Sequence, residues 1–158
     1  MNLREAGKLL GAIALCQLAG IIGAFATMPN IPTWYASLNK PFFNPPNWIF
    51  APVWTILYAL MGIALYFVWS NGLERKEVKD GVMLFGAQLA LNASWSFLFF
   101  GMQSPLLGLI CIVPLWMLIV LTIRKFYSVS KTSAYLMVPY LLWGTFATLL
   151  NLSIWLLN

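Results

Sequence analysis

The chain has 158 residues, of which 61% are hydrophobic and only 8% are charged. A soluble domain is about one quarter charged, so these values exclude a soluble enzyme, a disordered chain and a secreted disulfide scaffold. The net charge of +5 is not gathered in a basic stripe, so we expect no nucleic-acid partner. The chain has no histidine, the commonest metal ligand and general base. We therefore predict an integral membrane protein without a metal or cofactor.

Long runs without charge divide the chain into five predicted transmembrane helices. The third run is too long for one helix, and the turn-forming residues 101–105 (GMQSP) divide it. Since a spanning helix needs about 20 residues, the predicted fold is all-α: one domain, residues 1–158, forming a membrane bundle of five helices. The predicted helices cover residues 6–27, 48–70, 81–101, 105–124 and 133–157, and a loop covers residues 28–47.

The basic residues support this number of helices. With five spans, the N-terminus, the second loop and the fourth loop share one side, and eight basic residues lie there against Lys40 alone on the other. Because basic residues accumulate in cytoplasmic loops, we predict that the N-terminus is cytoplasmic. The eight residues, called the basic group below, are Arg4, Lys8, Arg75, Lys76, Lys79, Arg124, Lys125 and Lys131.

The N-terminus also admits a second interpretation. Arg4, Lys8, the apolar run and residues 24–26 (AFA) resemble a signal peptide with its cleavage site. The apolar run is long for a signal, and its removal would leave four helices. Small residues such as Gly20 and Ala24 fit a helix that packs closely on its neighbours, so we favour a first transmembrane helix.

The loop at 28–47 is the most unusual stretch of the chain, because five prolines forbid a continuous helix there. Its aromatic residues allow two interpretations, between which the sequence does not decide. They form an interfacial belt at the level of the lipid headgroups, or they belong to a lid that closes a cavity. These residues are Trp34, Tyr35, Phe42, Phe43 and Trp48.

The third predicted helix carries the most polar atoms. Gln88, Asn92 and Ser96 recur every four residues, so they share one face, with Trp95 beside them. Polar side chains cost free energy in hydrocarbon, so this face must look inward. It serves either as hydrogen-bonding contact between helices or as a polar anchor in an apolar pocket.

Two further helices carry aromatic stripes at helical spacing. Such stripes are more often ordinary packing than a ligand site. Three of them beside a proline-stiffened loop nevertheless favour a pocket for a flat, apolar ligand, and the small Ala147 leaves room beside Trp143. The stripes are Trp54, Tyr58 and Met61 on the second helix and Trp143, Ala147, Leu150 and Asn151 on the fifth.

Apart from Lys8 and Arg124 at their ends, the five predicted spans contain no Asp, Glu, Lys, Arg or His. Proton relays and ion-coupled carriers need such groups inside the membrane, so a pump or secondary active transporter is not expected. The chain also lacks a histidine, a carboxylate pair in a pocket and a phosphate-binding loop, so we do not expect a hydrolytic enzyme. Binding, passive passage and aromatic redox chemistry are the functions left.

Three segments resemble a known family, the translocator proteins, also called tryptophan-rich sensory proteins or peripheral benzodiazepine receptors. They are WYASLNKPFFNPPNWIFAPVWTILYALMG at 34–62, GAQLALNASWSFLFFG at 86–101 and VPYLLWGTFATLLN at 138–151. The resemblance implies a five-helix bundle, usually a homodimer, with a ligand pocket beneath the first loop. It also implies porphyrins such as protoporphyrin IX, or benzodiazepine-type compounds, as ligands.

The resemblance implies a membrane receptor or sensor that binds porphyrins or other lipophilic small molecules and that aids their transport. The alternative is an enzyme that degrades porphyrin by photo-oxidation, with Trp54 and Trp143 as the reactive pair. A third function is assisted movement of lipophiles across the bilayer. The ligand-binding residues predicted are Trp34, Tyr35, Phe50, Ala51, Trp54, Tyr58, Asn92, Trp95, Trp143, Ala147 and Leu150.

The chain departs from the family pattern at several positions. Phe43 stands where the loop often has a tryptophan, and Cys111 stands where many members have an acid. Leu152 and Leu156 replace the tyrosine and arginine of the animal cholesterol motif. We therefore do not expect high-affinity cholesterol binding. The departures fit a protein of a bacterial or archaeal cell membrane.

Overall fold

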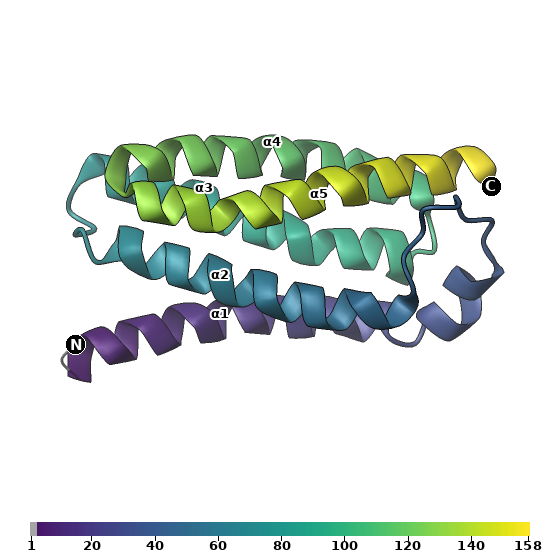
Figure 1. Cartoon of the computed structure of the whole chain (residues 1–158), viewed down its shortest axis with the longest axis horizontal. Coiled ribbons are helices and arrows are strands. Elements are labelled where there is room, and N and C mark those ends of the chain that lie inside the picture. Colours follow the sequence, from purple (N-terminus) through teal and green to yellow (C-terminus); the bar gives the residue numbers. More distant parts are fainter. Residues whose placement is uncertain (1–2) are drawn as a thin grey trace.

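The computed structural model describes residues 3–158, and five long helices lie side by side in it as an elongated bundle (Figure 1). All five are long and apolar enough to cross a membrane, and the described residues contain no strand. The predicted all-α membrane bundle is confirmed. The helices are α1 (Leu3–Thr27), α2 (Phe50–Trp69), α3 (Lys76–Ser96), α4 (Pro105–Val129) and α5 (Lys131–Leu157).

Several helices continue beyond their apolar runs. Helix α3 begins at Lys76 rather than at residue 81, and α4 extends to Val129 rather than to residue 124. The reason is that backbone hydrogen bonds, not apolar side chains, define a helix, and charged residues are tolerated in the outer turns. Ser130 alone separates α4 from α5, and its side chain caps α5 by accepting a hydrogen bond from the Ser133 amide at 3.3 Å.

The two ends of the bundle differ in charge. The N-terminus, the α2–α3 connection and the α4–α5 junction lie at one end, and the C-terminus lies at the other (Figure 1). The basic group therefore lies at the first end, and Lys40 lies in the long loop at the opposite end. This matches the predicted division of charge, whereas the cytoplasmic location of the N-terminus stays a prediction.

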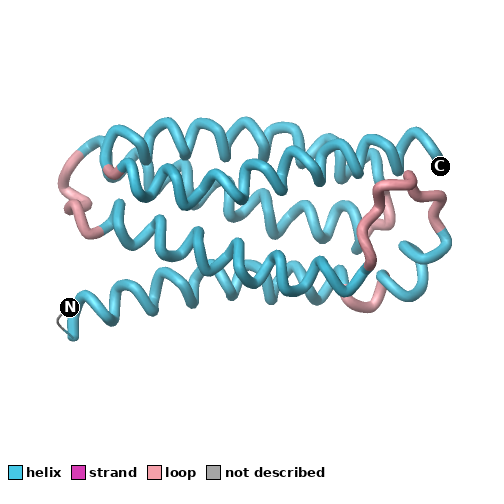
Figure 2. The backbone as a smooth tube through the Cα atoms, in the orientation of Figure 1, coloured by secondary structure: helices cyan, strands magenta, loops and turns pink. Residues whose placement is uncertain are grey.

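The loop at 28–47 folds across the end of the bundle (Figure 2). It contains a helical turn at Ile31–Tyr35, and a second turn, Asn47–Ile49, leads into α2. Asn39 joins the loop to the last turn of α5: its backbone amide donates to Asn158 Oδ1 at 3.0 Å and its Nδ2 donates to the Leu157 carbonyl at 3.2 Å. Trp48 is 73% exposed whereas Tyr35 is buried, and both interpretations of the loop stay predictions.

The helices pack tightly in the half of the bundle nearer the basic group. The rings of Phe85 on α3 and Phe126 on α4 are stacked with centroids 5.8 Å apart. Val68, Val78 and Met137 are fully buried beside them in the same core cluster. This half fixes the helices relative to one another and leaves the loop half free to form a cavity.

Candidate functional site

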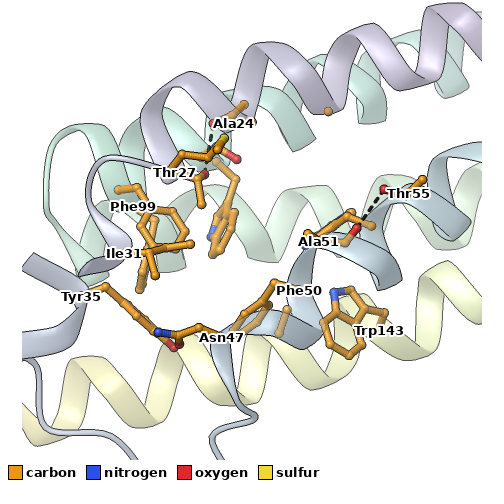
Figure 3. A pocket seen from close by; sticks show the side chains of 18 of the residues that line it. Ala24, Thr27, Ile31, Tyr35, Asn47, Phe50, Ala51, Thr55, Phe99 and Trp143 are labelled. Atoms are coloured by element: carbon orange, nitrogen blue, oxygen red, sulfur yellow. Dashed lines mark hydrogen bonds between the residues drawn. The ribbon is translucent and has the colours of Figure 1, made fainter. Parts of the chain in front are cut away.

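A cavity of about 350 Å³ lies beneath the loop, among α1, α2, α3 and α5. None of its lining residues is charged, and most of them are apolar. Figure 3 shows Tyr35, Phe50, Phe99 and Trp143 around this space. The lining residues are Gln17, Gly20, Ile21, Gly23, Ala24, Thr27, Met28, Ile31, Tyr35, Asn47, Phe50, Ala51, Trp54, Thr55, Tyr58, Trp95, Ser96, Phe99, Phe100, Trp143, Phe146, Ala147, Leu150, Asn151 and Ile154.

Small residues on α1 bring the first helix close to the cavity. A Cβ atom added at Gly20 would collide with the ring of Tyr58, and one at Gly23 would lie 2.8 Å from Ser96 Oγ. Only glycine allows these approaches, because it has no side chain. The glycines therefore let α1 form one wall of the cavity while the larger side chains of α2 and α3 remain in place.

Aromatic rings form the opposite walls. Phe50 and Trp143 meet edge to face with centroids 6.2 Å apart, and Trp143 lies 5.3 Å from Phe146. On α3, Trp95 stacks on the ring of Phe99 at 5.1 Å. Such ring pairs add stability beyond the area that they bury. These walls of the cavity are therefore largely aromatic.

The orientation of Trp95 is set by a hydrogen bond from its indole. Its Nε1 donates to Asn151 Oδ1 at 3.1 Å, and Asn151 Nδ2 donates to the Pro105 carbonyl at 2.7 Å. Asn151 is 2% exposed, and a buried polar group that loses its partner is costly. The amide thus links α3, α4 and α5 at the cavity wall.

Asn92 lies behind the main cavity rather than in it. Its Oδ1 accepts a hydrogen bond from the Tyr58 hydroxyl, and its Nδ2 donates to Tyr140 Oη at 2.9 Å. Trp54 stacks on Tyr58 above this network, with centroids 5.4 Å apart. Asn92 lines a second, smaller chamber of about 20 Å³ together with Trp54, Trp95 and Ala147. The Asn92 amide therefore joins three helices, as the interhelical interpretation predicts.

The loop contributes Tyr35 to the lining of the cavity. The Tyr35 hydroxyl donates to Asn44 Oδ1 at 2.6 Å within the loop, and burial raises its pKa to about 12. The hydroxyl thus stays protonated and keeps this hydrogen bond. Trp34 does not line the cavity: it packs edge to face on Phe99 at 5.4 Å and on Phe100 at 6.3 Å.

The structure brings nine of the eleven predicted ligand-binding residues to the main cavity, all except Trp34 and Asn92. Their role in binding stays a prediction. Sequence analysis missed the contribution of α1, whose small residues were interpreted only as helix packing. It also missed Gln17, although an amide inside a long apolar run is a signal of an inward-facing position.

Comparison with known proteins agrees with this architecture. The model of the TspO/MBR family matches residues 12–156. A tryptophan-rich protein TspO from Chlorobaculum tepidum is 51% identical over 146 residues, which are 92% of each chain. One from Archaeoglobus fulgidus is 48% identical over 152 residues, 96% of this chain and 97% of its own. The translocator protein of Bos taurus is 38% identical over 147 residues, 92% and 87% of the two chains. The chain is therefore an integral membrane protein that belongs to the TspO/MBR family.

Proposed function

We propose that this protein is a membrane receptor or sensor that binds a flat, apolar ligand of the porphyrin class in the cavity beneath the loop. Relatives are named translocator protein and tryptophan-rich sensory protein, which supports a receptor or sensor in the membrane. The observation that carries the proposal is the uncharged cavity of about 350 Å³ with aromatic walls. Ligand pockets of small molecules are typically apolar and about 300–1,000 Å³ in volume.

The aromatic lining of the cavity favours a planar ring over a globular ligand. Trp54, Trp95 and Trp143 all border the cavity, and aromatic rings bind other flat rings through stacked or edge-to-face contacts. The ordered loop above the cavity would shield the ligand from water. Assisted transport of such a ligand is compatible with this proposal and needs no additional site.

The experiment is a titration of the purified protein in lipid nanodiscs with protoporphyrin IX, followed by quenching of tryptophan fluorescence. Ala147→Leu adds three carbon atoms to the cavity wall and should weaken binding more than tenfold, with the fold retained by circular dichroism. Ala14→Leu makes the same change on the exposed face of α1 and should bind as the wild type does. Equal binding by all three proteins would refute the assignment of the cavity.

A second candidate function is photo-oxidative degradation of porphyrin, favoured by one observation. Trp54 and Trp143, the two indoles that the resemblance makes reactive, both line the cavity. Illumination of the porphyrin-loaded protein in air, compared among the wild type, Trp54→Phe and Trp143→Phe, tests this function. Loss of porphyrin at equal rates per bound ligand in the three proteins would identify ordinary photobleaching.

The assembly of two copies of the chain into a homodimer stays a prediction.

A further inference from the structure

The main cavity reaches the lipid-facing surface between α1 and α2. Ile21 on α1 is 53% exposed, and Ala51 and Thr55 on α2 are exposed, yet all three line the cavity. Figure 3 shows Ala51 and Thr55 along one edge of the space and Ala24 on the facing helix. Since these residues belong to membrane-spanning helices, this opening, called the lateral mouth below, faces the bilayer.

Gln17 lies at the lateral mouth. Its Nε2 donates to the Thr55 carbonyl at 2.9 Å, so the side chain crosses from α1 to α2, and it lines the cavity. It is the only amide side chain in α1. A polar group inside the membrane is costly unless it faces a partner or a cavity, and such residues commonly have a function.

The amide of Gln17 keeps hydrogen-bonding capacity after its bond to Thr55. A glutamine side chain has two N–H donors and one carbonyl oxygen with two lone pairs, and the Thr55 carbonyl takes one donor. Within residues 3–158 this is the one hydrogen bond of the Gln17 side chain. One N–H and the Oε1 therefore remain, side by side, for a ligand group that both accepts and donates.

Several other polar groups around the cavity already have hydrogen-bond partners, whereas Asn47 and Ser96, which also line it, belong to the turn that leads into α2 and to α3 rather than to the lateral mouth. The hydroxyls of Thr27 and Thr55 donate to carbonyls of their own helices at 3.1 Å and 2.9 Å. The Tyr35 hydroxyl donates within the loop, and the Tyr58 hydroxyl donates to Asn92. Gln17 is thus the polar side chain at the lateral mouth that is best placed to contact a ligand.

A carboxylic acid matches the remaining groups of Gln17. No charged side chain lines the cavity, and a carboxyl group in such surroundings is neutral, because low polarity disfavours the ionised form. A neutral carboxyl accepts a hydrogen bond through its carbonyl oxygen and donates one through its hydroxyl. It can therefore pair with the amide through two hydrogen bonds, one in each direction, whereas an ester can only accept.

We propose that Gln17 is a ligand-contacting residue that gives the cavity a preference for flat ring ligands carrying a protonated carboxylic acid, which enter from the bilayer through the lateral mouth. This inference rests on the proposed function and assigns the polar contact within it. The ring lies among the aromatic walls, and the carboxyl group meets Gln17 where the cavity opens between α1 and α2.

The test compares protoporphyrin IX with its dimethyl ester, by tryptophan quenching of the full chain in nanodiscs of neutral lipid. Gln17→Met keeps the length of the side chain and removes its hydrogen bonds. Loss of the amide pair should weaken binding of the acid about tenfold, as expected for two hydrogen bonds. Binding of the ester, which accepts only one hydrogen bond from the amide, should weaken by a clearly smaller factor. Retained ester binding also shows that the variant is folded.

A swapped variant, Q17L/L18Q, provides the matched control. It has the composition of the wild type but moves the amide to the position of Leu18, which is 53% exposed and does not line the cavity. It should lose the preference for the acid as Gln17→Met does. Equal weakening of acid and ester by Gln17→Met, or a preference for the acid restored in the swapped variant, would overturn the role of Gln17. Failure of the wild type to bind either compound would instead refute the proposed function.

Discussion

The two halves of the bundle are made by the same five helices but are filled differently. In the half near the basic group, large side chains such as Phe126, Phe85 and Met137 meet at the centre and are fully buried. In the loop half, aromatic rings of similar size stand around a space of about 350 Å³. The presence of large aromatic side chains therefore does not by itself decide whether a half of the bundle forms a packed core or a cavity.

The difference comes from where the small residues lie. In the loop half, Gly20, Gly23 and Ala24 on α1, Ala51 on α2 and Ala147 on α5 all line the cavity. The glycines let α1 approach Tyr58 and Ser96 closely, and a ring held by its neighbour, such as Trp95 by Asn151, is kept from moving into the cavity. A binding site in this fold thus results from small residues on some helices and anchored rings on others.

Removal of a large side chain should give the largest difference in stability between the two halves of the bundle. Phe126→Ala empties a fully buried site that stacks on Phe85, and we expect a loss of about 3–5 kcal/mol in the free energy of unfolding. Leu150→Ala removes a side chain that already borders the cavity, so fewer contacts are lost, and about 2 kcal/mol, the lower end of the range for such a substitution, is expected. Unfolding in mixed micelles measures both, and an equal or larger loss for Leu150→Ala would contradict the contrast.

Addition of a single methyl group should show how firmly the rings around the cavity are held. A Cβ atom at Gly108 would lie 2.7 Å from Phe99 Cδ2 and 2.8 Å from Asn151 Oδ1, so Gly108→Ala should displace both and cost about 1–3 kcal/mol in the free energy of unfolding. Gly86→Ala adds the same methyl where nothing lies within 4 Å and should stabilise by up to about 1 kcal/mol. The same unfolding measurement compares them, and a neutral Gly108→Ala would mean that the rings are free to move.

Sequence analysis predicted the fold well because membrane helices leave a direct record in hydropathy and charge. The turn at 101–105 and the positions of the basic group were enough to count five spans. The ends of α3 and α4 were harder to predict from the sequence. A helix continues as long as its backbone groups are hydrogen-bonded, whatever the polarity of the side chains in its outer turns.

The site was predictable only where a residue type itself indicates a binding surface. Trp54, Trp95 and Trp143 have indole rings at helical spacing, and all three line the cavity. Gly20 and Gly23 carry no such signal, because a small residue that makes room for a ligand looks the same as one that makes room for another helix. Trp34 shows the converse limit: its ring packs on Phe99 and Phe100 rather than on the cavity.

The pH dependence of the loop should be set by Tyr35. Because burial raises the pKa of Tyr35 to about 12 from an ordinary value of 10.0, the folded state holds this proton more tightly than the unfolded state does. The resulting stability is complete below pH 10.0 and is lost as the pH rises to about 12. The tyrosinate absorbance of the wild type minus that of Tyr35→Phe should show a transition near the upper value. A transition near the lower value would mean that the ring is exposed to water.

The smallest effect is expected from the hydrogen bonds that hold the loop to α5, because they are exposed to solvent. Asn39→Ala removes the 3.2 Å bond from Nδ2 to the Leu157 carbonyl and should change the free energy of unfolding by less than about 1 kcal/mol. The loop would nevertheless detach more often, so bound protoporphyrin IX should dissociate several times faster in stopped-flow measurements. Asn71→Ala is the control, because its Nδ2 makes a comparable bond of 2.7 Å to the Phe67 carbonyl at the opposite end of the bundle. Faster dissociation from both variants would indicate general loosening of the bundle, whereas an effect of Asn39→Ala alone assigns the control of ligand release to the loop.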